Sequence, residues 1–142
     1  MRISARTKYG IRALIDIAMH DTEEPVPVGL LATRLGISKN FLENLLLILK
    51  RKDLVIPSRG PKGGYALARH PADISMAEVF IALEGTEHLA CLSYSSNCPF
   101  SDYCTSRDLL EFLDKAMVNA LSSVTLESMA KKQALKTPVC IL

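Results

Sequence analysis

The chain has 142 residues, of which 49% are hydrophobic and 23% are charged. This length suits one compact unit with an extension and is too short for two ordinary domains. No apolar run approaches the roughly 20 residues of a membrane-spanning helix, and Arg12 and Asp16 interrupt any signal-like core, so we expect a mature cytoplasmic protein without a membrane partner.

Charge is unevenly divided along the chain. The net charge of +2 conceals twelve Lys or Arg against six Asp or Glu in residues 1–70, and five against nine in residues 71–142. A basic N-terminal half favours a polyanionic partner. The alternative is that these side chains merely solvate helix surfaces.

Apolar periodicity predicts three helices near the N-terminus. Residues 5–20 form the first helix, with its buried face on Ile11, Leu14, Ile15, Ala18 and Met19. A short helix over 28–35 ends at Gly36, a residue suited to a left-handed C-cap, and Ser38 is placed to cap a third helix to about Lys52. Two helices joined by a tight glycine turn are typical of a helix-turn-helix.

A β-hairpin should follow the third helix. Residues 54–67 contain two short apolar runs separated by a turn rich in Gly and Pro. A hairpin in this position, directly after a helix-turn-helix, is a wing. The fold class we predict is therefore mainly α, with a winged helix-turn-helix, a small wing and a long C-terminal dimerisation helix.

Three helices are predicted in the C-terminal half. Ser75 and Glu78 have the spacing of a capping box, so a helix should begin there and end near Gly85. Residues 105–122 form a long helix whose apolar set is wider than one buried stripe requires, which favours a partner helix. Thr125 is placed to cap a last helix to about Ala130, and we expect the tail beyond it to be mobile.

Polar side chains occupy the first turns of the third predicted helix, the part of a recognition helix that enters the major groove. Hydroxyl, amide and ammonium groups there can reach base edges and phosphates, and the residues concerned are Ser38, Lys39, Asn40 and Asn44. Glu43 can accept a hydrogen bond from a cytosine amine, or it can be an ordinary solvated residue.

Two further segments are candidates for DNA contact. The guanidinium of Arg59 suits a narrow minor groove, and Gly60 and Pro61 permit close approach of the wing. A plain hairpin with a surface arginine is the alternative. At the start of the first helix, four side chains are placed to contact phosphate, namely Arg2, Ser4, Arg6 and Lys8.

Three of the four cysteines lie in one short polar loop, at Cys91, Cys98 and Cys104. Converging thiols suggest a metal or iron–sulfur site, although cytosolic thiols can also be small buried hydrophobic groups. A reducing compartment and the odd count disfavour disulfides, and spacings of six and then five residues are too wide for a zinc knuckle. Cys140, isolated near the C-terminus, is best interpreted as a free thiol.

Four segments in order, together with the cysteine loop, resemble the IscR/NsrR/CymR family of winged-helix regulators, the Rrf-two family. They are residues 1–4, 8–16, 36–43 and 59–65, so the resemblance covers nearly the whole chain. It implies a homodimer clasped by the long helix, with two winged helices on palindromic double-stranded DNA. In the cluster-bearing branch it also implies an iron–sulfur cluster, 2Fe-2S or 4Fe-4S, held by the three cysteines.

The resemblance leaves the fourth cluster ligand open. Some relatives use a histidine shortly after the third cysteine, and others use a carboxylate near the partner's N-terminus. This sequence has Arg107 and Lys8 at those places. The alternatives are His88, Asp102, Asp108 or an exogenous ligand. His88 can equally be a surface histidine, and Asp108 an acid favoured by the helix dipole.

We therefore expect a non-enzymatic, dimeric DNA-binding regulator. Residues 1–70 should form the DNA-binding domain, and residues 71–142 the sensor and dimerisation region. The expected signal is iron–sulfur supply, nitric oxide or redox state. A cluster-free regulator of sulfur or cysteine genes is the nearest alternative, and a small electron carrier or cluster-transfer protein is a more distant one. Operator sequence, cluster type and the choice between activation and repression are not encoded in recognisable motifs.

Overall fold

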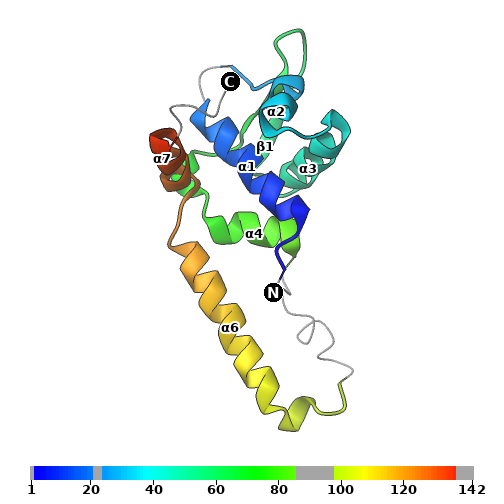
Figure 1. Ribbon diagram of the computed structural model, residues 1–142, viewed down its shortest axis with the longest axis vertical. Helices are drawn as coiled ribbons and strands as arrows, with labels where there is room; N and C mark the ends of the chain where they lie inside the picture. Colours follow the sequence, from blue (N-terminus) through cyan, green and yellow to red (C-terminus); the bar gives the residue numbers. More distant parts are fainter. Residues whose placement is uncertain (1, 21–23, 86–97, 137–142) are drawn as a thin grey trace.

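The computed structural model describes residues 2–20, 24–85 and 98–136. The fold is mainly helical, with one antiparallel two-stranded sheet between the third and fourth helices (Figure 1). The elements are α1 (Ala5–Met19), α2 (Val28–Leu35), α3 (Lys39–Arg51), β1 (Val55–Ser58), β2 (Gly64–Leu67), α4 (Met76–Glu84), α6 (Thr105–Ser122) and α7 (Leu126–Lys136). The predicted order of helices, hairpin and long helix is confirmed.

Helix α1 lies at the centre of the body and packs against α2, α3, α4 and α7. Two residues of its predicted stripe, Leu14 and Ile15, are buried, while Ile11, Ala18 and Met19 are only partly buried. Ala13 and Ile17 are fully buried as well, which the single-stripe prediction missed. The reason is that other helices cover α1 on several sides, so its apolar surface exceeds one face.

The helix-turn-helix forms as its local sequence predicts. Gly36 adopts the left-handed conformation at the end of α2, with φ of 65°. The Ser38 hydroxyl then accepts a hydrogen bond from the Phe41 amide at 3.2 Å and caps α3. One face of α3 is buried and anchors the helix in the core through Leu42, Leu45, Leu46 and Leu49.

The wing is fastened to the segment that precedes α2. Strands β1 and β2 pair from Val55 opposite Leu67 to Ser58 opposite Gly64. Val26 then pairs with Tyr65, the two residues exchanging hydrogen bonds of 2.8 and 2.9 Å between their backbone groups. A Cβ at Gly64 would lie 2.1 Å from the Val26 carbonyl oxygen, so this close approach requires glycine.

Helices α4 and α7 begin side by side. The Met76 amide donates to the Val124 carbonyl and the Leu126 amide donates to the Ile74 carbonyl, each at 2.8 Å. Ser75 caps α4 as predicted by accepting from the Glu78 amide, but the Glu78 carboxylate pairs with Arg69 instead of completing a capping box. Because Leu126 and Ile74 are fully buried, both helix starts join the core that α1 organises.

The last helix is longer than predicted. Thr125 caps α7 by accepting from the Ser128 amide at 3.2 Å, but the helix continues to Lys136 instead of ending near Ala130. Residues 131–136 are strong helix formers, and Glu127 pairs with Lys131 one turn later at 3.2 Å. The prediction of a mobile tail from residue 131 is therefore wrong for the described part of that segment.

Helix α6 extends away from the body (Figure 1). None of its 18 residues is buried, and three large apolar side chains are exposed to 58%, 68% and 49%, namely Leu109, Phe112 and Leu113. The predicted excess of apolar surface on this helix is confirmed. Among the described helices, none is both long and apolar enough to cross a membrane.

The N-terminus of α1 is bonded to the C-terminal end of α4. The Glu84 carboxylate accepts a hydrogen bond from the Thr7 hydroxyl at 2.6 Å and from the Ser4 amide at 2.8 Å. The bond from Thr7, with those from Ser4 and the nearby charge of Arg6, outweighs the effect of burial and lowers the pKa of Glu84 below its ordinary value.

The close approach of the wing to Val26 generates a stability prediction. Gly64→Ala should destabilise the protein by roughly 1 to 3 kcal/mol, since the new methyl group would overlap backbone that cannot move without breaking the pairing. Gly29→Ala is the matched control, because Gly29 lies in α2 with open space around it and alanine favours a helix by about 1 kcal/mol. Urea unfolding should move the two midpoints in opposite directions, and equal shifts would contradict the packing of the wing.

The lowered pKa of Glu84 predicts a pH-dependent contribution to stability. The folded state holds the carboxylate charged more strongly than the unfolded chain does, so the stabilisation is complete at neutral pH and is lost as pH falls through the folded-state pKa. Glu84→Gln should therefore lower the free energy of unfolding at neutral pH, and its difference from the parent should shrink in acid. A difference that stays constant with pH would show that Glu84 ionisation does not stabilise the fold.

Candidate nucleic-acid interface

The first turns of α3 present a polar surface to solvent. Lys39, Asn40, Glu43 and Asn44 are all exposed, as their proposed role requires. The Lys39 ammonium lies 4.0 Å from the Glu43 carboxylate, so this acid is partly neutralised by a neighbour one turn away. The Ser38 hydroxyl already accepts the capping bond, which leaves its proton as the group that can reach a phosphate or base.

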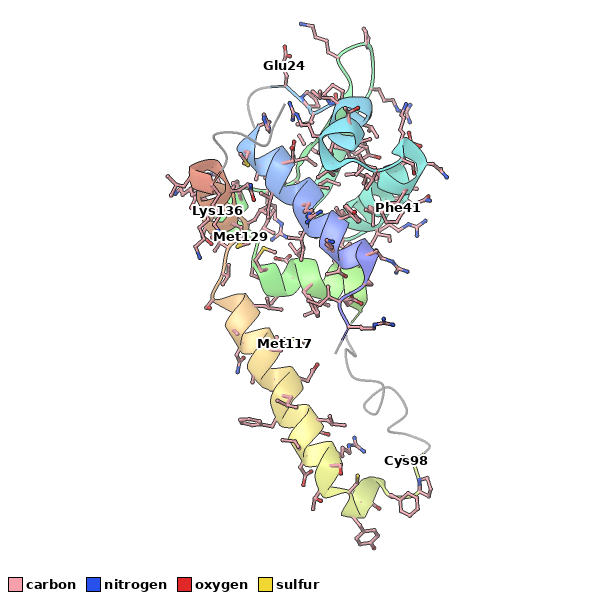
Figure 2. The ribbon with its side chains drawn as sticks, in the orientation of Figure 1. Glu24, Phe41, Cys98, Met117, Met129 and Lys136 are labelled. Carbon is pink, nitrogen blue, oxygen red and sulfur yellow. The ribbon has the colours of Figure 1, made fainter. Side chains whose placement is uncertain are left out.

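Helix α1 adds positive charge beside the start of α3. The rings of Tyr9 and Phe41 meet edge to face with their centroids 6.0 Å apart, and Figure 2 shows Phe41 between the two helices. The Lys8 ammonium lies 5.6 Å and the Arg12 guanidinium 5.4 Å from the centre of the Tyr9 ring. Tyr9 and Arg12 were not predicted as interface residues, although their spacing places them together on one helix face.

The wing and the recognition helix border one concave surface. Arg59, Gly60 and Pro61 are exposed at the turn of the hairpin. A groove of about 440 Å³ lies between the wing and the starts of α2 and α3, and Lys39, Glu43 and Gly60 line it. The structure thus brings together two segments that the sequence analysis assigned separately to DNA contact.

Two predicted DNA-contact residues near the N-terminus, Arg2 and Ser4, differ in their surroundings. Arg2 is exposed and can contact phosphate. The amide and the hydroxyl group of Ser4 have partners inside the protein, because the amide donates to Glu84 and the hydroxyl oxygen accepts from the Thr7 amide at 3.2 Å. Ser4 therefore has a structural task as the N-cap of α1, besides any contact with DNA.

Two of the predicted thiol ligands lie at the far end of α6. Cys98 and Cys104 flank the short 3-10 turn Ser101–Tyr103, are partly exposed and form no disulfide. Figure 2 shows Cys98 beyond the far end of α6. Cys91, His88 and Cys140 lie outside the described residues. Within the described ranges, no three His, Cys, Asp or Glu side chains are grouped to hold a metal ion.

The acidic candidates for a fourth ligand are both accessible. Asp102 lies in the turn between the two thiols, and Asp108 lies in the first turn of α6. Both residues are exposed. Arg107, which stands where some relatives are expected to have a histidine, donates to the Glu111 carboxylate at 3.0 Å.

Comparisons with known proteins agree with this geometry. The family model described as Rrf2, an iron-dependent transcriptional regulator, matches residues 3–132. The regulator IscR of Xenorhabdus nematophila is 34% identical over 133 residues, which cover 94% of this chain and 81% of that protein.

Solved structures give the same result for the fold. The structure of T. potens IscR superposes with a TM-score of 0.79 and 31% identity, over 98% of this chain and 93% of that one. The structure of CymR, the global cysteine regulator of B. subtilis, superposes with a TM-score of 0.73 and 28% identity, over 93% and 98%. The winged helix, its basic surface and these matches lead to one conclusion: the chain belongs to the Rrf2 family of DNA-binding transcriptional regulators.

Proposed function

We propose that this regulator acts as a homodimer on palindromic double-stranded DNA and senses iron–sulfur supply, nitric oxide or redox state through a cluster on Cys91, Cys98 and Cys104. The observation that carries the proposal is the arrangement of the two ends of the molecule. A groove between α3 and the wing lies on the body, with the exposed cations Lys39 and Arg59 on these two elements. Partly exposed thiols lie at the far end of α6, a helix with unburied apolar side chains.

DNA contact is expected to divide between the helices α1 and α3 and the wing. Lys39 and Lys8 supply charge for phosphate, while Asn40 and Asn44 offer amides that suit adenine in the major groove. The exposed Arg59 side chain is available for the adjacent minor groove. The basic half of the chain, rather than a single residue, provides the electrostatic attraction.

A second copy of the chain is the occupant that we propose for the apolar surface of α6. Leu109, Phe112 and Leu113 follow one another at helical spacing and remain exposed in one protomer. Pairing two such helices would remove this surface from water. A dimer would also place two recognition helices for the two halves of a palindrome.

The described cysteines fit an iron–sulfur cluster in chemistry. Cys98 and Cys104 are soft ligands, free of disulfide and accessible, and the family description names iron dependence. A bound cluster would supply reactivity toward nitric oxide and oxidants, and its assembly would follow iron and sulfide supply. In this proposal the chain itself holds the thiols beside a short turn, and this turn leads directly into α6.

A cluster-free regulator of sulfur or cysteine genes is the second candidate. The similarity to the CymR fold supports it, as does the arginine at position 107, whose guanidinium is bonded to Glu111 and does not offer an iron ligand. Membership of a family of transcriptional regulators argues against a small electron carrier.

The basic surface predicts a steep salt dependence of DNA binding. A duplex selected by the protein from a random pool should bind with an affinity that falls with salt concentration, and Lys39→Ala should reduce the slope of log K against log salt by about 1. Asn40→Ala should leave the slope unchanged and reduce discrimination between the selected duplex and a scrambled one. Fluorescence anisotropy titrations measure both effects, and a salt-insensitive complex would contradict the proposed interface.

The cysteine proposal predicts which thiols the chromophore requires. After anaerobic reconstitution with iron and sulfide, Cys91→Ala, Cys98→Ala and Cys104→Ala should each lose the visible absorbance of the cluster, and Cys140→Ala should keep it. The fold should survive each change, because no residue of α6 or of the described part of the cysteine segment belongs to the buried core. Circular dichroism checks the fold, and iron and sulfide counts check the cluster.

The same series separates the two candidates. A parent protein that forms no iron-linked absorbance, yet binds the selected duplex, would favour the cluster-free regulator. A parent that binds cluster but whose DNA affinity is identical with and without it would contradict the sensor role.

A further inference from the structure

The end of α4 is locked against the first half of α1. A Cβ at Gly10 would lie 2.7 Å from one terminal methyl carbon of Leu83 and 2.8 Å from the other, so the glycine allows these helices to cross at close range. Both residues are buried. Because close-packed elements transmit small displacements, the position of the last turn of α4 constrains the position of α1.

Glu84 extends this contact to the cap of α1. Its carboxylate accepts from the Ser4 amide at 2.8 Å and from the Thr7 hydroxyl at 2.6 Å, and the Ser4 and Thr7 hydroxyl oxygens lie 3.2 Å apart. Thr7 has no exposed surface, and it is the one polar side chain classed as buried among the described residues. A buried hydroxyl of this kind requires its partner, so Glu84 fixes the geometry of the first turn.

The segment held in this way carries part of the basic surface. Arg2, Arg6 and Lys8 flank Ser4 and Thr7 along the chain and are exposed. After the hydrogen bonds from Thr7 and Ser4, the positive charge of Arg6 also contributes to the lowered pKa of Glu84. Glu84 also lies seven residues before Cys91 in the sequence, on the helix that leads toward the cysteines.

We propose that Glu84 is a positioning residue for DNA binding, which holds the N-terminal turn of α1 so that its basic side chains meet the phosphate backbone. This inference rests on the proposed DNA-binding surface. Glu84 itself does not contact DNA in this proposal. It acts through Ser4 and Thr7, and it links the helix before the cysteines to a segment that binds phosphate.

A carboxylate near DNA can also weaken binding by repelling phosphate, and this effect must be distinguished from positioning. If Glu84 only repelled phosphate, Glu84→Ala would tighten binding and steepen the salt dependence. If it positions cations, the same change weakens binding roughly tenfold and lowers the salt slope by about 1 to 2, since one or two phosphate contacts are lost. The two mechanisms therefore predict opposite signs.

The test compares Glu84→Ala with Glu78→Ala in anisotropy titrations of the full chain on its selected duplex. Glu78 lies on the same helix but pairs with Arg69, so its removal should leave affinity and salt slope unchanged. Thr7→Val should reproduce the weakening by removing only the hydroxyl, and Thr7→Ser should restore binding because it keeps that group. If Glu84→Ala fails to fold, the comparison of Thr7→Val with Thr7→Ser still tests the proposal.

A double-mutant comparison shows whether Glu84 acts through the cations. In an Arg2→Ala, Arg6→Ala background, Glu84→Ala should have little further effect, whereas in a Lys39→Ala background its effect should be additive. Unchanged affinity and salt slope in Glu84→Ala, or tighter binding, would overturn the inference while the parent still binds DNA. A parent that does not bind DNA would overturn the proposed function together with the inference.

Discussion

Burial of α1 is the constraint on which the rest of the structure depends. Leu14, Ala13 and Ile17 are withdrawn completely from water because α2, α3, α4 and α7 all pack on this helix. Helix α1 therefore fixes three parts of the protein relative to one another. These are the recognition helix α3, the base of the wing, which α1 contacts at β2, and the start of the C-terminal region. A change that loosened α1 would alter all of these at once.

This arrangement explains how two chemically different ends can belong to one regulator. Exposed basic side chains lie on α1, at the start of α3 and on the wing, and Tyr9 joins α1 to α3 through its contact with Phe41. The thiols lie at the other end of the long helix, where Cys104 is the N-cap of α6 and Cys98 precedes it. Between them, α6 packs against α4, whose Glu84 is bonded to the cap of α1, and α7 packs against α1.

The sequence was sufficient for features that local chemistry determines. Gly36 and Ser38 mark a helix end and a helix start, and both conformations were predicted because each depends on neighbours within a few residues. The end of α7 was mispredicted because the helix propensity of the whole segment decides it. The pairing of Glu78 was mispredicted because its partner, Arg69, lies outside the helix that Glu78 belongs to. The bond between Glu84 and Thr7 joins residues 77 positions apart, so no local pattern indicated it.

Lysine labelling in the presence of DNA tests the central claim most directly, because lysines lie both on the proposed DNA-binding surface and on α7, on the other side of α1 from α3 (Figure 1). Acetylation read by mass spectrometry should show that the selected duplex protects Lys8, Lys39 and Lys62, which lie on α1, α3 and the wing. Lys131 and Lys136 on α7 should remain as reactive as in the free protein. Protection of the α7 lysines with Lys39 and Lys62 still reactive would contradict the proposed DNA-binding surface.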